Sequence, residues 1–297
     1  WKLGVLNDPF NYAKYTTQSN GKVLYETTLD EAQIPKQSFV ANKVITVIDN
    51  RQANLQKIVT DLMSKFSPES SYVHLGYEAV TLSSETAKLL GNKTDGREVQ
   101  MSGRKGLYIN ADEIIEKLEK RIYLESKERN TSLDDASLNE IAHNVANGTI
   151  RYELIKPDLD KIITFDINTS LKLEGDTCSY IQYSCVRAAR ILEKSDKKPD
   201  FNASFDQLNT EHDLNLIKQI GMFEIFVNDA AKNYSPKVIA KYCYGLAVTF
   251  SSFYEHVKVL KAETPELVNA RLCLVLSFGL TLEKALDLLG IIVPRRM

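Results

Sequence analysis

The feature that most constrains the fold is the helical periodicity of apolar residues from Tyr180 onward. These residues recur three and four positions apart in successive segments, with Pro236 and Pro265 near expected helix starts and Gly290 just after an expected end. The expected helical segments begin at Ile181, Leu214, Val238 and Leu267. Such helices bury their apolar stripes against one another. The sequence therefore predicts an all-α helical bundle over residues 178–297.

The first part of the chain has the pattern of a β-α-β unit. The β-branched run from Lys43 to Asp49 precedes a segment, Leu55 to Met63, with apolar residues at helical spacing. A second apolar run follows from Tyr72 to Leu82. Two apolar runs separated by one helix are typical of buried parallel strands. We therefore expect an α/β region of partial Rossmann type within a first domain, residues 1–110.

The segment between these two regions is expected to connect them. The polar stretch from Gly91 to Gly106 predicts a loop, and Asp112 is placed as the N-cap of a helix. A second helix is expected to stop at Gly148, and residues 151–166 then alternate between apolar and polar. Residues 111–177 are therefore interpreted as a connecting region.

The composition limits the kinds of partner. The 37 Lys and Arg residues nearly balance the 39 Asp and Glu residues, so nucleic-acid binding needs a local basic patch. Residues 178–297 carry slightly more basic than acidic side chains, which favours such a patch there. We find no run that approaches the 18 or so apolar residues of a membrane span, and the start lacks the order of a signal peptide. We therefore expect a cytoplasmic protein without membrane contact.

The cysteines predict neither a metal site nor a disulfide. None of them has C-x-x-C spacing, and all lie in helical, apolar surroundings, which favours reduced thiols in a core. They are Cys178, Cys185, Cys243 and Cys273.

The loop Met101-Ser102-Gly103-Arg104-Lys105-Gly106 is the first candidate for chemistry. Its small residues expose backbone N–H groups, and its two cations add positive charge, a combination that suits a polyphosphate. A solvated loop can have the same composition. The position of this loop between an α/β unit and a helical region favours the phosphate-binding interpretation.

Five segments in order resemble the arginyl-tRNA synthetases, a class I family. Gln100 to Gly106 resembles a degenerate K-M-S-K-S loop, and Val47 to Gln52 resembles a strand of the family that ends in Gln. The other resembling segments are Arg151 to Arg187 in parts, Phe253 to Leu260, and Ala270 to Leu272 with the terminus Leu289 to Met297. The resemblance covers nearly all of the chain after about residue 40.

The resemblance implies an arginine–tRNA ligase that attaches arginine to tRNA(Arg) with ATP, together with Mg²⁺, in protein synthesis. It implies that Met101, Ser102, Gly103, Arg104 and Lys105 bind ATP. Within this loop Ser102, Arg104 and Lys105 are the implied catalytic residues, because they would stabilise charge on the departing pyrophosphate. The implied enzyme is a monomer.

The resemblance also implies a binding site for the amino acid. Gln52 stands where the family has a substrate-binding Gln, and Tyr25 is similar to a substrate-contacting Tyr of the family. The match at Tyr25 is irregular, because the spacing to Asp30 is one residue longer and an Arg is lacking; a surface aromatic is the alternative. His74 matches an H-x-G-Y strand, for which a structural role is expected. The H-x-G-H half of the ATP site is missing from the 297 residues, so the chain alone is expected to make no adenylate.

In the helical region the resemblance implies that Tyr254, Lys258 and Met297 line an anticodon pocket. Aromatic side chains beside cations commonly hold unstacked RNA bases. The roles of Arg187 and Arg271 stay open: each could form a structural ion pair or contact a phosphate. Residues 111–177 would contact the tRNA stem. The alternative functions are a non-catalytic tRNA-binding or regulatory protein of the same family, and an unrelated nucleotide-binding protein.

Overall fold

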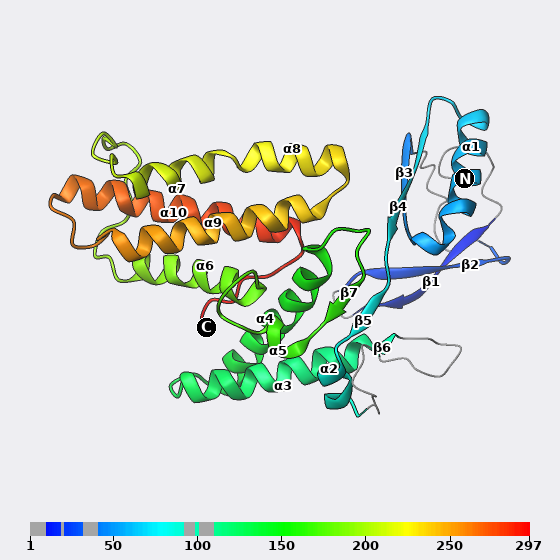
Figure 1. The fold of residues 1–297 in the computed structure, drawn as a ribbon, viewed down its shortest axis with the longest axis horizontal. Coiled ribbons are helices and arrows are strands. Elements are labelled where there is room, and N and C mark those ends of the chain that lie inside the picture. The colour runs from blue at the N-terminus through cyan, green and yellow to red at the C-terminus, as the bar shows by residue number, and fades with distance from the viewer. Residues whose placement is uncertain (1–9, 19–20, 32–40, 92–98, 101–109) are drawn as a thin grey trace. The chain divides into compact units, whose positions relative to one another are not determined.

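A computed structural model describes residues 10–18, 21–31, 41–91, 99–100 and 110–297 of the chain (Figure 1). The chain divides between Glu78 and Ala79 into two compact units. Each unit is described by itself.

The first unit contains the expected β-α-β arrangement. β3 (Lys43–Asp49) leads through a short 3₁₀ turn into α1 (Ala53–Phe66), and β4 (Ser71–Tyr77) then pairs with β3 in parallel. This confirms the strand–helix–strand prediction for this segment. The unit also has an antiparallel hairpin of β1 (Asn11–Thr17) and β2 (Val23–Thr28), which the sequence analysis missed.

A polar relay ties α1 to the two parallel strands. The Thr46 hydroxyl donates to the Tyr72 hydroxyl at 2.9 Å, and Tyr72 donates to Oε1 of Gln56 at 2.7 Å. Gln56 is the buried residue of α1. His74 lies on β4, where its Nε2 is 2.9 Å from the Ile48 carbonyl oxygen, as a structural role requires.

The second unit begins with a small sheet. β5 (Val80–Leu82) pairs in parallel with β7 (Ile163–Phe165) and antiparallel with β6 (Val99–Gln100). The apolar run from Tyr72 to Leu82 is therefore not one strand, because β4 and β5 belong to different sheets. The short helix α2 (Ser84–Leu89) follows β5, and α5 (Ile167–Ser170) follows β7.

Two long helices, α3 (Ala111–Arg129) and α4 (Asp135–Ile155), pack along each other in the second unit. The N-cap of α3 is Asn110 rather than Asp112, and its side chain accepts a hydrogen bond from the Asp112 N–H at 3.2 Å. The prediction at Asp112 was thus two residues late.

The expected helix end at Gly148 was wrong. A Cβ at this position would lie 2.9 Å from Nε2 of Gln182 and 3.0 Å from Sγ of Cys178, so the glycine allows α6 to approach α4 closely. The helix continues to Ile155, and of the alternating segment 151–166 only β7 is a strand.

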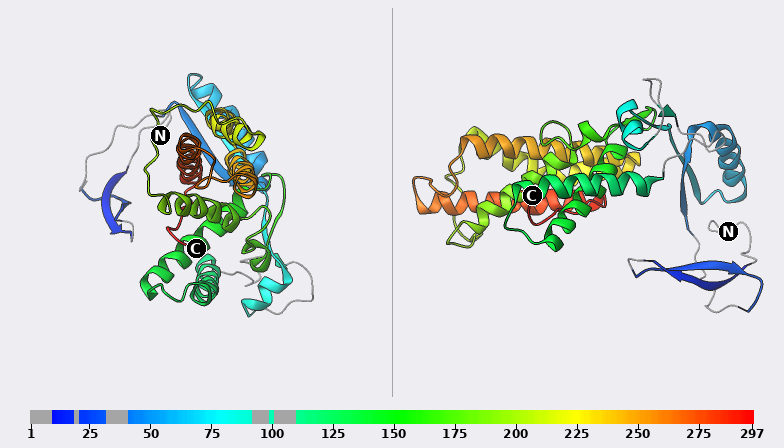
Figure 2. Two further views of the ribbon diagram at one scale, coloured as in Figure 1. Left: turned by 90° about the vertical axis from the view of Figure 1, so that its left-hand side faces the viewer. Right: turned by 90° about the horizontal axis from the view of Figure 1, so that it is seen from below.

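The bundle contains the predicted helical segments in the last part of the chain, with two changed boundaries. Figures 1 and 2 show α6, α7, α9 and α10 lying side by side, with α4 in contact with α6 and α9. Its helices are α6 (Cys178–Glu193), α7 (Glu211–Gly221), α8 (Phe223–Asn233), α9 (Pro236–His256) and α10 (Pro265–Leu288). The expected helix over Leu214 to Val227 breaks at Met222, where the Gln219 carbonyl accepts hydrogen bonds from the Met222 N–H at 3.3 Å and the Tyr242 hydroxyl at 3.0 Å. The helix expected to run to Leu260 ends at His256.

Large apolar side chains fill the core of the bundle. The Phe250 and Phe278 rings stack with centroids 3.8 Å apart, and both side chains have no exposed surface. Within the described residues α10 alone has the length and mean hydropathy of a membrane span, at 1.3, contrary to the expectation that no segment approaches one. Half of that segment is buried against the rest of the protein, as in the core helix of a bundle.

Candidate functional site

The residues predicted to bind ATP lie outside the described part of the chain. They are Met101, Ser102, Gly103, Arg104 and Lys105. The catalytic roles assigned to Ser102, Arg104 and Lys105 stay predictions.

Polar residues gather at the carboxyl ends of the parallel strands β3 and β4. Asp49 caps the 3₁₀ turn by accepting a hydrogen bond from the Arg51 N–H at 2.8 Å, and its carboxylate pairs with the Arg51 guanidinium at 2.8 Å. These hydrogen bonds from Arg51 lower the pKa of Asp49 to about 2. Gln52 ends the same turn with an exposed side chain. Ligands of open α/β sheets bind at this edge, so the position of Gln52 fits its predicted role.

Gly76 leaves space for a neighbouring side chain at this edge. A Cβ there would lie 1.9 Å from Oδ1 of Asn50, whose amide donates to Glu78 at 3.0 Å. Tyr25 lies on β2 with about half of its surface exposed, and Asp30 follows the same strand. The Asp30 carboxylate accepts from the Thr28 hydroxyl at 3.3 Å. The roles of Tyr25, Asp30 and Gln52 toward an amino acid are untested.

A first cavity of the bundle, here called the α6–α9 pocket, has a volume of about 320 Å³. It combines aromatic, basic and aliphatic side chains. Its lining residues are Tyr183, Arg187, Arg190, Ile191, Lys194, Tyr254, Val257, Val259 and Leu260. Three of these side chains are cations and none is a carboxylate, so the pocket favours an anionic ligand.

Arg187 occupies the space beside two tyrosine rings of this pocket. Its guanidinium carbon is 4.0 Å from the Tyr254 ring centroid and 5.3 Å from that of Tyr183. Arg187 forms no ion pair in the part of the chain that the structure describes. Its planar group is therefore held by the rings, and its charge is not neutralised by a carboxylate.

The basic side chains of the pocket form a stripe along α6. Arg187, Arg190 and Lys194 follow Tyr183 at spacings of four, three and four residues, which places them on one helix face. Arg187 was a candidate from the sequence, whereas Arg190, Lys194 and Tyr183 were not predicted as site residues. The spacing was visible in the sequence, but which face of the helix is left uncovered depends on the packing of α6.

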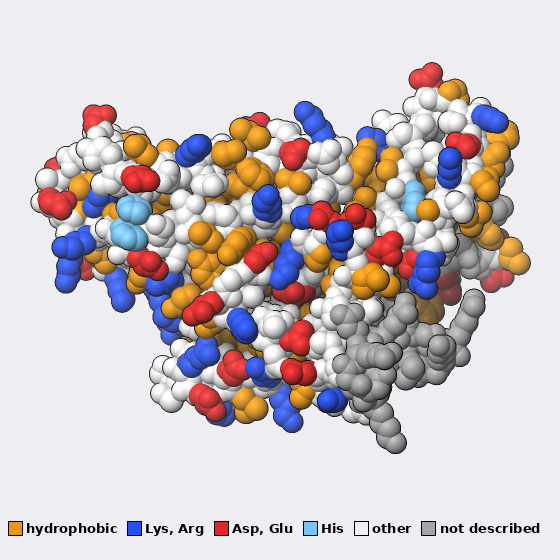
Figure 3. Space-filling view, viewed as in Figure 1, with side chains coloured by type: hydrophobic (Ala, Val, Ile, Leu, Met, Phe, Trp, Pro, Cys, Tyr) orange, Lys and Arg blue, Asp and Glu red, His pale blue; other side chains and the backbone are white. Residues whose placement is uncertain are grey.

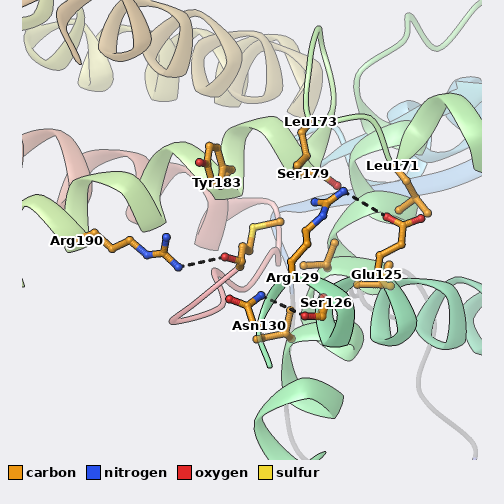
Figure 4. Close-up of a pocket in the computed structure, with 13 residues that line it drawn as sticks. Glu125, Ser126, Arg129, Asn130, Leu171, Leu173, Ser179, Tyr183 and Arg190 are labelled. Atoms are coloured by element: carbon orange, nitrogen blue, oxygen red, sulfur yellow. Dashed lines mark hydrogen bonds and ion pairs between the residues drawn. The ribbon is translucent and has the colours of Figure 1, made fainter. Parts of the chain in front are cut away.

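A second cavity, the α3–α6 pocket, has a volume of about 280 Å³ and shares Tyr183 and Arg190 with the first. Figure 4 shows Arg129 beside Glu125, and their ion pair measures 3.9 Å. Arg190 donates to the Met297 carbonyl oxygen at 3.2 Å. Apolar side chains form much of its remaining wall. They are Ile122, Ile141, Val145, Leu171, Leu173 and Met297.

The three residues predicted to contact tRNA have different positions. Tyr254 lines the α6–α9 pocket, and Met297 lines the α3–α6 pocket. Lys258 has an exposed side chain and stands between Val257 and Val259, which do line the first pocket. The Lys258 carbonyl oxygen accepts a hydrogen bond from Arg271 at 3.0 Å. Their contacts with RNA stay predictions.

The cysteines contribute no reactive group. All four are free and buried, and burial raises the pKa of each thiol. Thiols with raised pKa values are poor nucleophiles and poor metal ligands at neutral pH. In the described ranges no group of three or more His, Cys, Asp and Glu side chains is arranged to hold a metal ion.

Residues 181–297 match the model of the DALR anticodon binding domain. This segment runs from the first turn of α6 through α10 and contains every lining residue of the α6–α9 pocket.

Comparison with known proteins extends the similarity over nearly the whole chain. The arginine–tRNA ligase of Borrelia hermsii is 33% identical over 96% of this chain and 47% of its own length. That of Methanothrix thermoacetophila is 37% identical over 66% of this chain and 35% of its own length.

The solved structure of Thermus thermophilus arginyl-tRNA synthetase matches 100% of this chain and 47% of its own length. The TM-score is 0.81, and the sequences are 30% identical. The chain thus spans about half the length of most relatives that it matches. It is related to the arginyl-tRNA synthetases, with a DALR anticodon binding domain matched at residues 181–297.

Proposed function

We propose that the helical bundle binds the anticodon loop of tRNA(Arg). The observation that carries this proposal is the α6–α9 pocket, in which Arg187 lies against Tyr254 beside Arg190 and Lys194. Aromatic rings and flat guanidinium groups hold unstacked bases of RNA loops, while neighbouring cations attract the phosphates. The match of residues 181–297 to an anticodon binding domain supports the same ligand.

The two adjoining pockets suit neighbouring bases of one loop. They meet at Tyr183 and Arg190, so a base in each pocket would have these two side chains between them. Because Arg187 already covers one side of the Tyr254 ring, we assign base stacking first to Arg187 and only second to Tyr254. Met297 would contact the base in the α3–α6 pocket.

The bundle would serve an arginine–tRNA ligase that uses ATP and arginine. In this proposal the first region is a partial Rossmann-type fold, Gln52 and Tyr25 contact arginine, and the loop Met101 to Lys105 contacts ATP. Mg²⁺ would accompany ATP and be held mainly by its phosphates. The proposal rests on similarity to the named ligases, and it places the protein in the cytoplasm as a monomer.

The pocket is tested by measuring the binding of tRNA(Arg) to the chain and to its Arg187→Ala variant at several salt concentrations. We expect the dissociation constant to rise about tenfold or more, because loss of a stacked group costs about 1–3 kcal/mol. Lys232→Ala is the matched control, since Lys232 is an exposed cation of α8 outside both pockets. Equal affinities of the two variants would contradict the proposal, as would equal binding of a tRNA with a changed anticodon.

A second assay separates the ligase from a non-catalytic tRNA-binding protein. The ligase predicts arginine-dependent exchange of pyrophosphate into ATP when the chain is tested within the whole enzyme, and replacement of Arg104 and Lys105 by Ala should reduce it by about 10²–10³-fold. Specific tRNA binding without any exchange would favour the regulatory alternative.

A further inference from the structure

One wall of the α6–α9 pocket is a segment without regular secondary structure. Residues 257–260 follow the end of α9, and Val257, Val259 and Leu260 line the pocket. Val257 and Val259 are buried, with 9% and 7% of their surfaces exposed. An irregular segment that shapes a binding pocket needs contacts that fix its backbone.

Arg271 of α10 supplies such a contact from inside the bundle. The residue is 6% exposed, and its Nη1 donates to the Lys258 carbonyl oxygen at 3.0 Å. Its Nε and Nη2 donate to the two carboxylate oxygens of Asp213 at 3.3 and 3.4 Å. The guanidinium therefore joins a buried carboxylate to the backbone of the pocket wall.

Asp213 is itself fixed by the first turn of α7. It has no exposed surface, and its Oδ2 accepts hydrogen bonds from the Thr210 hydroxyl at 2.6 Å and the Thr210 N–H at 3.2 Å. The bond from the Thr210 N–H, together with a bond from the Asp213 N–H to the Thr210 hydroxyl oxygen at 3.1 Å, forms a capping box, which ties the carboxylate to the helix N-terminus. Through its ion pair with Asp213, Arg271 thus connects residues 257–260 to the first turn of α7.

A stacked histidine pair joins the same helix end to α9. The rings of His212 in α7 and His256 at the end of α9 are 4.5 Å apart and nearly parallel, at 8°. Histidine side chains lie side by side in pale blue in Figure 3. His256 directly precedes Val257, so the start of the pocket wall and its middle are both held to the first turn of α7.

We propose that Arg271 and Asp213 are positioning residues for tRNA binding, which hold the segment 257–260 in the shape that a nucleotide needs. The inference rests on the proposed function of the α6–α9 pocket. It assigns Arg271 a structural role and no phosphate contact, because its three hydrogen bonds to Asp213 and Lys258 all lie within the protein. The planar fork of an arginine can bond the carboxylate and the carbonyl together, which a lysine ammonium does poorly.

The test compares Arg271→Lys with Leu216→Ala in the intact chain, at a temperature where both are folded. Leu216 is a fully buried residue of α7 outside the pocket, so its variant controls for a loss of stability alone. We expect Arg271→Lys to raise the dissociation constant for tRNA(Arg) about tenfold and Leu216→Ala to leave it unchanged. The slope of log affinity against log salt concentration should stay at its wild-type value, because no phosphate contact is lost.

Hydrogen exchange supplies a readout that does not need RNA. We expect the peptide covering residues 257–260 to exchange faster in Arg271→Lys than in Leu216→Ala, with equal exchange in α8. If Arg271→Lys does not fold, Asp213→Asn keeps the shape of the side chain and gives the same comparison.

Three results would overturn the inference: an affinity loss no greater than that of the control, a salt slope reduced by about one, or unchanged exchange at 257–260. Absence of tRNA binding by the wild-type chain would instead refute the proposed function. The exchange result would then still show whether Arg271 fixes the segment.

Discussion

The bundle and the β-α-β unit of residues 43–77 bury their apolar side chains to very different degrees. In the bundle Phe250, Phe253 and Phe278 have no exposed surface. In the other unit Val47 of β3 is 62% exposed, and Leu55 of α1 is 56% exposed. Both regions have the regular pattern of their secondary structure, so a correct local pattern does not by itself produce a core.

The number of packed layers explains this difference. Helices α6, α7, α9 and α10 each pack against at least two others, whereas in the described residues the parallel sheet of the first unit consists of β3 and β4, with α1 tied to it by the Tyr72 relay. Sheets of two strands are marginal because they leave much of their apolar surface in water. The stability of the bundle therefore depends less on further packing contacts than the stability of the β-α-β unit does.

The largest expected effect tests this contrast directly. Phe250→Ala should lower the free energy of unfolding by about 3–5 kcal/mol, because it leaves a cavity against Phe278. Leu55→Ala should change it by no more than about 0.5 kcal/mol, because Leu55 is mostly exposed. Urea unfolding followed by circular dichroism measures both, and similar losses in the two variants would show that the regions are equally well packed.

A smaller effect is expected where one tyrosine hydroxyl is removed from each region. Tyr152 is fully buried, and its hydroxyl donates to Asp176 at 2.5 Å. Tyr152→Phe should cost about 1–3 kcal/mol, since it removes the hydrogen bond to the charged Asp176 and the donor at 3.3 Å from the buried Ala240 carbonyl oxygen. Tyr72→Phe removes the relay to Gln56 in a partly buried position and should cost about 0.5–1.5 kcal/mol. If Tyr72→Phe lowers the melting temperature more than Tyr152→Phe does, the expected difference between the two regions is wrong.

The smallest expected effect is a difference in pH dependence. Burial raises the pKa of Glu153 in α4, so the folded state holds this proton more tightly than the unfolded state does. Its contribution to stability is therefore greatest below the usual pKa of a glutamate and is lost as the pH rises through the folded pKa. Relative to Glu153→Gln, the wild type should lose stability from about pH 4 upward.

Asp49 in the first unit should have the opposite sign. Hydrogen bonds from Arg51 lower its pKa to about 2, so its contribution is present above the usual pKa of an aspartate and is lost as the pH falls toward about 2. Unfolding of the wild type, Asp49→Asn and Glu153→Gln across this pH range measures both trends. If the stability difference from the wild type changes with pH in the same direction for both variants, the opposite signs expected for Glu153 and Asp49 are wrong.

The sequence could predict most helices and the β-α-β unit because their periodicities are local. It misjudged Gly148, which lies inside α4, where a Cβ would crowd Gln182 and Cys178, residues much later in the chain. The break at Met222 likewise depends on a carbonyl that Tyr242 of another helix satisfies. Errors of this kind arise where tertiary contacts override a local preference.

The candidate site could be predicted only in part for the same reason. Tyr254 and Met297 were expected from the resemblance and do line pockets, although their RNA contacts are untested. The contact between Arg187 and Tyr254 joins α6 to α9, and nothing in the spacing of either helix reveals it. Only the packing of the two helices brings the stacked pair together.

The arginine held against the tyrosine rings has a consequence for the speed and strength of recognition. The rings hold its guanidinium in the folded protein, so RNA binding, in the function proposed above, would not have to order that long side chain. Ordering a flexible side chain on association costs about 0.5–1.5 kcal/mol, and here that entropy loss precedes the encounter. In the proposed function the pocket would thus act as a preformed template, and adaptation would be left to the flexible RNA loop.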